Sequence, residues 1–408
     1  MNAAVAATQP PPLPPPATSS GTRPSTGPST GPSTGPPTAT PTAPTPLDVV
    51  TAADRIAPYT LPTPLLPGPE PGAAGGPRLL LKAEHLQLGG SFKTRGAANA
   101  VLALGARRIV TGSSGNHGIA LARIARRLRV PLVVVLTAAA SPAKVAALHA
   151  LGAETVLTEG GVEEREARAL ALAQESGAVL IPSSDHPLVV AGGGTVGAEV
   201  LAEAPETEAL YVPTGGGGLL AGTCLAAIGH PVRVVGVEPA LTPRYARSLA
   251  AGRPVRLPPS TTVADGLRGQ SPGTVTYPIV RDHVDELILV DEEAIVAAAE
   301  QLRRLGVHAE PSGAVALAGA LRAGRREQAV AVVSGGNTPE RLAALRHPRT
   351  ERDTGRDTGP PAGPDRRTDA RTSAVGTPRY AAHQATDRPH GHHNNPLHPH
   401  QHPQEHTP

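Results

Sequence analysis

The 408-residue chain has very few cysteine and aromatic residues. Cys224 is its one cysteine, so an internal disulfide is excluded and a reducing compartment is expected. The chain has no tryptophan and one phenylalanine, so its core must be built from alanine, valine and leucine. No apolar run is long enough to span a bilayer, and the first residues lack the basic start and apolar stretch of a signal peptide. We therefore expect a soluble, cytoplasmic protein with no membrane partner.

The chain also has no large net charge of either sign. The formal net charge is +3, and the arginines do not gather into a stripe with interleaved aromatic residues. This pattern does not indicate nucleic acid binding.

Composition divides the chain into two tails and a core. Residues 1–46 are mostly Pro, Thr, Ser, Gly and Ala, and residues 347–408 are polar and end in a histidine-rich tract. Neither segment has enough apolar residues to bury, so both are predicted to be disordered. The irregular histidine spacing in a proline-rich tail is not a metal-site geometry. The remaining 47–346 is long enough for one large domain or two lobes.

Within the core, short apolar runs alternate with helical patterns. Residues 51–66 form a lead-in segment broken by prolines, and the first buried strand is expected at 79–81. Val133, Val134 and Val135 run together without alternation, which is typical of a parallel strand buried on both faces. We predict a doubly wound α/β fold whose ligands lie at the carboxyl ends of the strands.

Four glycine-rich turns occur in this core. They are Gly89-Gly90-Ser91-Phe92-Lys93, Ser113-Ser114-Gly115-Asn116-His117-Gly118, Thr214-Gly215-Gly216-Gly217-Gly218-Leu219 and Ser334-Gly335-Gly336-Asn337. The last three follow apolar β-type runs and precede helical patterns, where backbone N–H groups can bind an anion.

Two of these turns suggest chemistry from their residues alone. Lys93 could form a Schiff base with an aldehyde if it were desolvated, although a solvated lysine at a helix start is the simpler interpretation. Gly215 to Gly218 would suit a phosphate ester, and the alternative is a flexible turn. The loop matches neither a P-loop nor the dinucleotide fingerprint.

Taken together and in this order, the four segments resemble the tryptophan-synthase-type (fold type II) pyridoxal-phosphate enzymes. The nearest match is the branch of serine/threonine ammonia-lyases and serine racemases. The resemblance implies two lobes, each a mainly parallel sheet flanked by helices, with the smaller lobe at about 90–187. It also implies pyridoxal 5'-phosphate in the cleft, a small amino-acid substrate, and a homodimer or higher homo-oligomer.

The resemblance assigns roles to individual residues. Lys93 would hold the cofactor, and Ser114 would be the second base of a racemase. The other cofactor-binding positions would be Phe92, Asn116, Gly215, Gly216, Gly217, Gly218, Leu219, Gly266, Glu310 and Ser334. The α-carboxylate of the substrate would lie against Ser113, Ser114, Gly115, Asn116 and His117, and His117 itself is expected to shape the loop rather than to catalyse.

The chain departs from the family at a divalent-metal site. The family uses a glutamate, matched by Glu238, a backbone carbonyl and an acid a few residues on. Here Arg244 stands where that acid is expected, and an arginine cannot ligate a cation, so we predict no metal. Gly193 replaces a glutamine that is often found at this position in the family, and the loop at 186–190 is shortened. Because this loop borders the substrate pocket in the family, the identity of the substrate is not predicted.

The predicted function is β-elimination of a hydroxyamino acid such as L-threonine or L-serine to a 2-oxo acid and ammonia. An amino-acid racemase on the same scaffold is the close alternative. β-Replacement is disfavoured, because that branch resembles Ser-Gly-Asn-Thr where this chain has His117. An alternative of another class is a non-catalytic pyridoxal-phosphate-binding protein that acts through its tails.

Overall fold

The computed structural model describes residues 43–69, 79–113, 115–138, 140–324 and 327–344. The predicted C-terminal tail therefore lies outside the described residues, and so does the predicted N-terminal tail apart from residues 43–46. A six-stranded sheet has the order β1-β2-β10-β7-β8-β9, in which only β1 is antiparallel to its neighbour. Its strands are Leu65–Pro67 (β1), Leu79–Lys82 (β2), Ala209–Pro213 (β7), Arg233–Pro239 (β8), Glu286–Val290 (β9) and Ala329–Val332 (β10).

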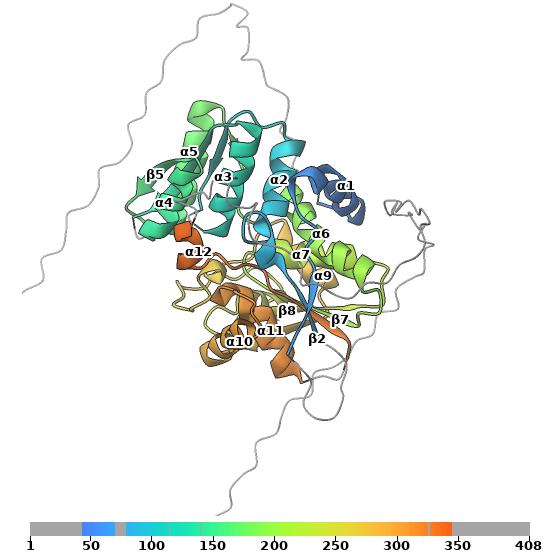
Figure 1. Ribbon diagram of the computed structural model, residues 1–408. Helices are drawn as coiled ribbons and strands as arrows, with labels where there is room; N and C mark the ends of the chain where they lie inside the picture. The colour runs from blue at the N-terminus through green and yellow to red at the C-terminus, as the bar shows by residue number, and fades with distance from the viewer. Residues whose placement is uncertain (1–42, 70–78, 114, 139, 325–326, 345–408) are drawn as a thin grey trace, which may run out of the picture. The chain divides into compact units, whose positions relative to one another are not determined.

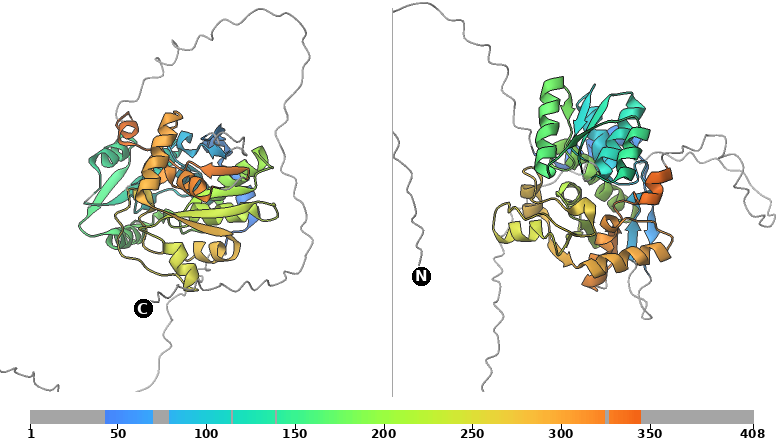
Figure 2. Two further views of the ribbon diagram at one scale, coloured as in Figure 1. Left: turned by 90° about the horizontal axis from the view of Figure 1, so that it is seen from below. Right: turned by 90° about the vertical axis from the view of Figure 1, so that its left-hand side faces the viewer.

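A second, four-stranded sheet is parallel throughout and has the order β5-β4-β3-β6. Its strands are Ile109–Thr111 (β3), Leu132–Thr137 (β4), Glu154–Thr158 (β5) and Val179–Leu180 (β6). All of them fall inside the segment predicted for the smaller lobe, whose boundaries stay a prediction. The right-hand view of Figure 2 shows this sheet with a green helix on one side and teal helices on the other.

Helices cover both sheets, as the alternating pattern predicts. Those near the four-stranded sheet are Lys93–Ala103 (α2), Asn116–Leu128 (α3), Pro142–Ala150 (α4) and Val162–Ser176 (α5). Helix α6 (Pro187–Glu203) packs against α1 (Pro46–Ile56), α2 and α7 (Gly218–Ala227) (Figure 1). The others are α8 (Arg244–Ala250), α9 (Thr276–His283), α10 (Glu292–Arg304), α11 (Pro311–Ala323) and α12 (Pro339–Ala344), with 3-10 turns at Ala57–Tyr59 (η1), Glu84–Leu86 (η2) and Asp265–Leu267 (η3).

The core is built from small aliphatic side chains. Val134, Leu136 and Ile119 are buried between the four-stranded sheet and its helices, and Val212, Val330 and Leu220 are buried beside the six-stranded sheet. Parallel strands covered on both faces explain why the apolar runs show no alternation. None of the described helices is both long and apolar enough to cross a membrane.

Candidate active site

Lys93 is the first residue of α2, directly after the turn at Gly89–Phe92. Gly90 has φ +72°, and a Cβ there would lie 2.1 Å from Oδ1 of Asn337, so the turn requires glycine. Lys93 is a partly buried residue whose ammonium donates to the carbonyl of Ser183 at 2.6 Å and lies 4.9 Å from the centre of the Phe92 ring. Burial lowers the pKa of Lys93 to about 8. The amine can therefore lose its proton near neutral pH.

The glycine loop, Gly215 to Gly218, lies between the end of β7 and the start of α7. Gly217 has φ +88°, and a Cβ there would lie 1.8 Å from the hydroxyl of Tyr245. The loop therefore presents backbone N–H groups without side chains at a helix N-terminus, an arrangement that binds phosphate esters. Leu219 packs its side chain into the core beside the six-stranded sheet, so only its backbone could reach such an anion.

One pair of neighbouring residues connects the lysine with this loop. The carbonyl of Ser183 accepts the hydrogen bond from Lys93. A Cβ at Gly216 would lie 2.2 Å from Oγ of Ser184, and one at Gly218 would lie 2.9 Å from the Ser184 carbonyl. The amine and the glycine loop therefore both contact the same dipeptide, which brings them to one place in the fold.

A buried amide and carboxyl cluster includes two of the predicted residues. Asn116, at the start of α3, donates its side-chain N–H to Glu310, which stands at the N-cap position of α11. Asn337 donates to Oδ1 of Asn116 at 2.8 Å and to the carbonyl of Gly89 at 3.0 Å. Burial raises the pKa of Glu310 to about 7, so this carboxyl can carry a proton near neutral pH.

Ser334 and Gly266 are connected through Ser312. The Ser334 hydroxyl lies 3.4 Å from the carbonyl of Ser312, and the Ser312 hydroxyl accepts from the N–H of Gly266 at 2.9 Å. The backbone of Ser334 also accepts the N–H of Phe92 at 3.0 Å. The predicted cofactor-binding positions Ser334 and Gly266 therefore lie in one connected group that reaches the lysine turn.

Two residues of this group, Ser312 and Asn337, were not predicted as site residues. Asn337 is the last residue of the glycine-rich turn at 334–337, and Ser312 stands two residues after Glu310. The only available signal was their position beside Glu310 and Ser334. Their partners are distant in sequence, 46 residues away for the Ser312–Gly266 bond and 221 for the Asn337–Asn116 bond.

The loop predicted to bind the α-carboxylate is described in part. Ser114 lies outside the described residues, whereas Ser113 and Gly115 flank it on the way into α3. His117 is buried, and its Nε2 lies 3.1 Å from the carbonyl of Ile181. Because a carbonyl only accepts, Nε2 carries the proton. Burial and the nearby charge of Lys93 lower the pKa of His117 to about 3, which favours a neutral residue that shapes the loop.

Glu238 and Arg244 stand at the position of the family's metal site. Among the described residues, no group of three or more His, Cys, Asp or Glu side chains could hold a metal ion. Both oxygens of Glu238 accept backbone N–H groups, from Tyr245 and Ala246 at 3.0 Å each. Arg244 is fully buried, and its charge acts on the Glu238 carboxyl. A guanidinium next to an already hydrogen-bonded carboxylate does not suit a divalent cation.

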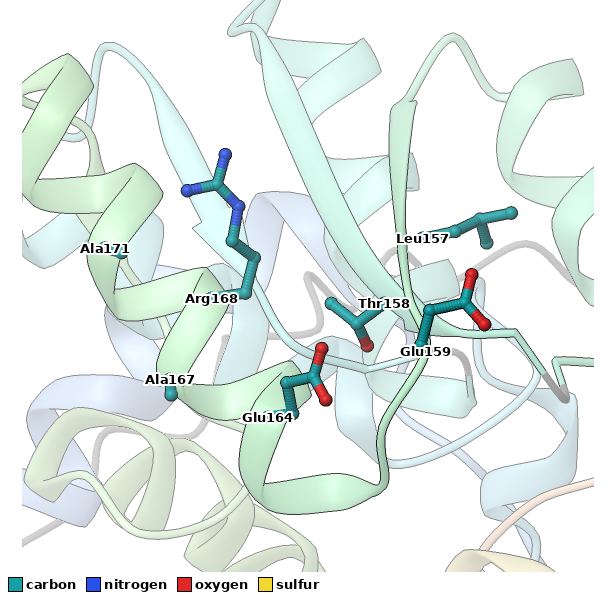
Figure 3. Close-up of a pocket in the computed structure, with 7 residues that line it drawn as sticks. All are labelled: Leu157, Thr158, Glu159, Glu164, Ala167, Arg168 and Ala171. Atoms are coloured by element: carbon teal, nitrogen blue, oxygen red, sulfur yellow. The ribbon is translucent and has the colours of Figure 1, made fainter.

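A depression of about 490 Å³ lies elsewhere, between β5 and α5 (Figure 3). Its size is in the range of ligand sites. It is lined by Leu157, Thr158, Glu159, Glu164, Ala167, Arg168 and Ala171, and none of the predicted site residues is among them.

Known proteins resemble this chain over the same region. Residues 56–335, more than half of the chain, match the family model described as "Pyridoxal-phosphate dependent enzyme". A serine racemase of Oryza sativa subsp. indica is 40% identical over 66% of this chain and 81% of its own length. The L-threo-3-hydroxyaspartate ammonia-lyase of Saccharomyces cerevisiae is 37% identical over 74% of this chain and 96% of its own. A solved threonine deaminase, from the organism abbreviated T.th., has a TM-score of 0.68 and 44% identity, over 72% of this chain and 99% of that one.

The described site fits the cofactor that this family uses. A lysine of lowered pKa can bond to an aldehyde, and the glycine loop can bind a phosphate ester. The family match and the parallel sheets confirm the predicted fold and cofactor. The chain belongs to the pyridoxal-phosphate-dependent enzymes of fold type II, in the branch that contains the serine/threonine ammonia-lyases and serine racemases.

Proposed function

We propose that the protein is an ammonia-lyase that converts a small hydroxyamino acid, such as L-threonine or L-serine, to a 2-oxo acid and ammonia. The observation that carries the proposal is the Ser183-Ser184 dipeptide, which contacts both Lys93 and the glycine loop. Two of the similar proteins described above carry a lyase or deaminase name.

Each group at the site would have its own role in the reaction. When bound, pyridoxal phosphate supplies an electron sink for the α-carbon. Lys93, with a pKa of about 8, is the base that takes the α-proton. Backbone N–H groups at the start of α3 would bind the α-carboxylate. Glu310 holds a proton beside Asn116 near neutral pH and orients that amide.

A racemase is the second candidate, since the rice relative carries that name. It would need a base on the opposite face of the α-carbon, and Ser114 is the predicted residue. Comparing D-serine formed from L-serine with pyruvate released separates the two reactions. A Ser114→Ala variant that lost only D-serine formation would establish the second base.

Replacement of Lys93 tests the proposal. We expect Lys93→Ala to lose both the visible absorbance of bound cofactor and ammonia release from threonine, serine, 3-hydroxyaspartate, phenylserine and diaminopropionate. Lys144→Arg is the matched control, because it keeps the charge that faces Asp265 at 2.5 Å. Ammonia release retained in Lys93→Ala would refute the assignment. A wild-type protein that binds the cofactor but deaminates none of these substrates would favour the non-catalytic alternative.

A further inference from the structure

Arg244 is a fully buried arginine at the start of α8. Its Nη2 donates to the carbonyl of Leu267 and to the hydroxyl of Thr242, the latter at 2.7 Å. Its Nη1 lies 3.4 Å and 3.7 Å from the positions that a Cβ would take at Gly269 and Gly215. Arg244 therefore contacts the glycine loop at its first residue and the turn that follows η3.

Part of the guanidinium has no hydrogen-bond partner. Among the described residues, nothing accepts from Nε or Nη1 of Arg244. A buried donor without a partner is costly, so a cation kept in this place needs a compensating role. The charge of Glu238 provides part of the compensation, because it acts to raise the pKa of Arg244 against the lowering caused by burial.

The next residue, Tyr245, also contacts the glycine loop. The Tyr245 hydroxyl lies 3.2 Å from the Gly216 carbonyl and 2.8 Å from Oγ1 of Thr276. The backbone N–H of Tyr245 in turn donates to Glu238. Residues 244 and 245, fixed to Glu238, thus hold both the glycine loop and the turn that carries Gly266.

We propose that Arg244 is a positioning residue whose fixed positive charge takes the place of a bound divalent cation, so that the cofactor-binding loops are held in place without metal. The charge attracts the Leu267 carbonyl and the Glu238 carboxylate, the two kinds of oxygen that a hard cation would otherwise bind. The inference rests on cofactor binding at the glycine loop and not on which substrate is used.

The first test compares the wild-type protein with and without cations. The dissociation constant of pyridoxal phosphate for the cofactor-free protein, and the melting temperature of the loaded protein, should be the same in EDTA and in excess Mg²⁺ or Ca²⁺. Loss of cofactor affinity in EDTA that either cation restores would overturn the proposal. Neither readout needs turnover, so a failure here is distinguishable from a wrong substrate assignment.

The second test separates charge from packing. Arg244→Met keeps most of the buried aliphatic volume, whereas Arg244→Lys keeps the charge. We expect Arg244→Met to weaken cofactor binding by about tenfold or more, and Arg244→Lys to retain most of the affinity. A packing role predicts the opposite order and would contradict the proposal. Arg247→Met, an exposed arginine on the same helix, is the matched control and should bind as the wild type does.

The third test uses a variant whose cofactor affinity should depend on a divalent cation. Arg244→Asp places a second carboxylate near Glu238, so cofactor affinity should fall in EDTA and recover in Ca²⁺ or Mg²⁺. An Arg244→Asp variant that binds the cofactor in EDTA as tightly as the wild type would show that the positive charge has no positioning role.

Discussion

At the scale of single residues, Lys93 destabilises the fold by an amount that depends on pH. Its pKa is about 8 in the fold and 10.5 as an ordinary lysine. The unfolded chain therefore binds more protons between these values, and stability rises with pH across that window. Below pH 8 the burial of the charged amine costs at most about 3 kcal/mol. Such a cost is typical of residues selected for reactivity.

The Lys93→Met variant tests this cost. Without cofactor, it should be more stable than the wild type at pH 7 because it has no charge to bury, and the gain should fall to less than half at pH 9.5. Urea unfolding of the two cofactor-free proteins at both pH values measures the difference. A gain that does not change with pH would mean that the amine is not desolvated.

His117 predicts an effect in the acid range. Its pKa is about 3 in the fold and 6.5 as an ordinary histidine. Below pH 6.5 the histidine of the unfolded chain takes up a proton that the buried His117 does not. The free energy of unfolding therefore decreases as the pH falls from 6.5 towards 3. His117→Asn should therefore lose less stability than the wild type between pH 7 and pH 5, by about 2 kcal/mol. Urea unfolding of the wild type and of His117→Asn at these two pH values measures the difference. An equal loss of unfolding free energy in the two proteins would contradict a buried neutral histidine.

At the scale of elements, Asp185 fixes the loop between β6 and α6. Its carboxylate accepts the N–H groups of Thr274 at 2.7 Å and Val275 at 2.8 Å, directly before α9. The same loop carries Ser183 and Ser184, which contact Lys93 and the glycine loop. One side chain therefore couples the start of α9 to the candidate site.

Asp185→Ala should remove this coupling. We expect a loss of about 2 kcal/mol in unfolding free energy, together with a lower kcat/KM because Ser183 and Ser184 lose their support. Urea unfolding and steady-state ammonia release measure the two effects. Asp282→Ala is the control, since this exposed acid on α9 pairs with its neighbour Arg281. Unchanged kinetics in Asp185→Ala would show that the loop is fixed by other contacts.

The elements that the sequence predicted are those with local signals. Gly217 and Gly90 need positive φ, and the turns that contain them can be recognised from composition. Helix α1 was missed, because its capping box of Thr45 and Asp48 stands in a proline-rich stretch that resembles a tail. The support from Asp185 could not be predicted, because it depends on contacts between residues about 90 positions apart.

At the scale of the whole described fold, a network of buried charges connects α2, the helix that begins at Lys93, to η2, α6 and β2. Arg95 of α2 pairs with Glu84 at 2.7 Å and with Glu199 of α6 at 2.6 Å, and Lys82 of β2 pairs with Glu199 at 2.7 Å. The two cations and two anions balance one another. Replacing one partner would leave a buried charge uncompensated.

Arg95→Met should accordingly lose about 3 to 5 kcal/mol of unfolding free energy. The double variant Arg95→Met with Glu84→Gln should recover part of this loss, because the stranded carboxylate is removed. Urea unfolding of both proteins measures the effect. A single variant that loses less than about 1 kcal/mol would mean that the network behaves as an exposed ion pair does.

The proposed function requires a covalent bond between Lys93 and the aldehyde of pyridoxal phosphate, and this bond can be tested directly. Its three lysines are Lys82, Lys93 and Lys144, and two of them are held in ion pairs, with Glu199 and Asp265. Borohydride reduction of the cofactor-loaded protein makes a lysine–cofactor bond permanent, and peptide mass mapping locates it. We predict the pyridoxyl group on the peptide that contains Lys93. Its presence on Lys82 or Lys144, or on no lysine, would contradict the account.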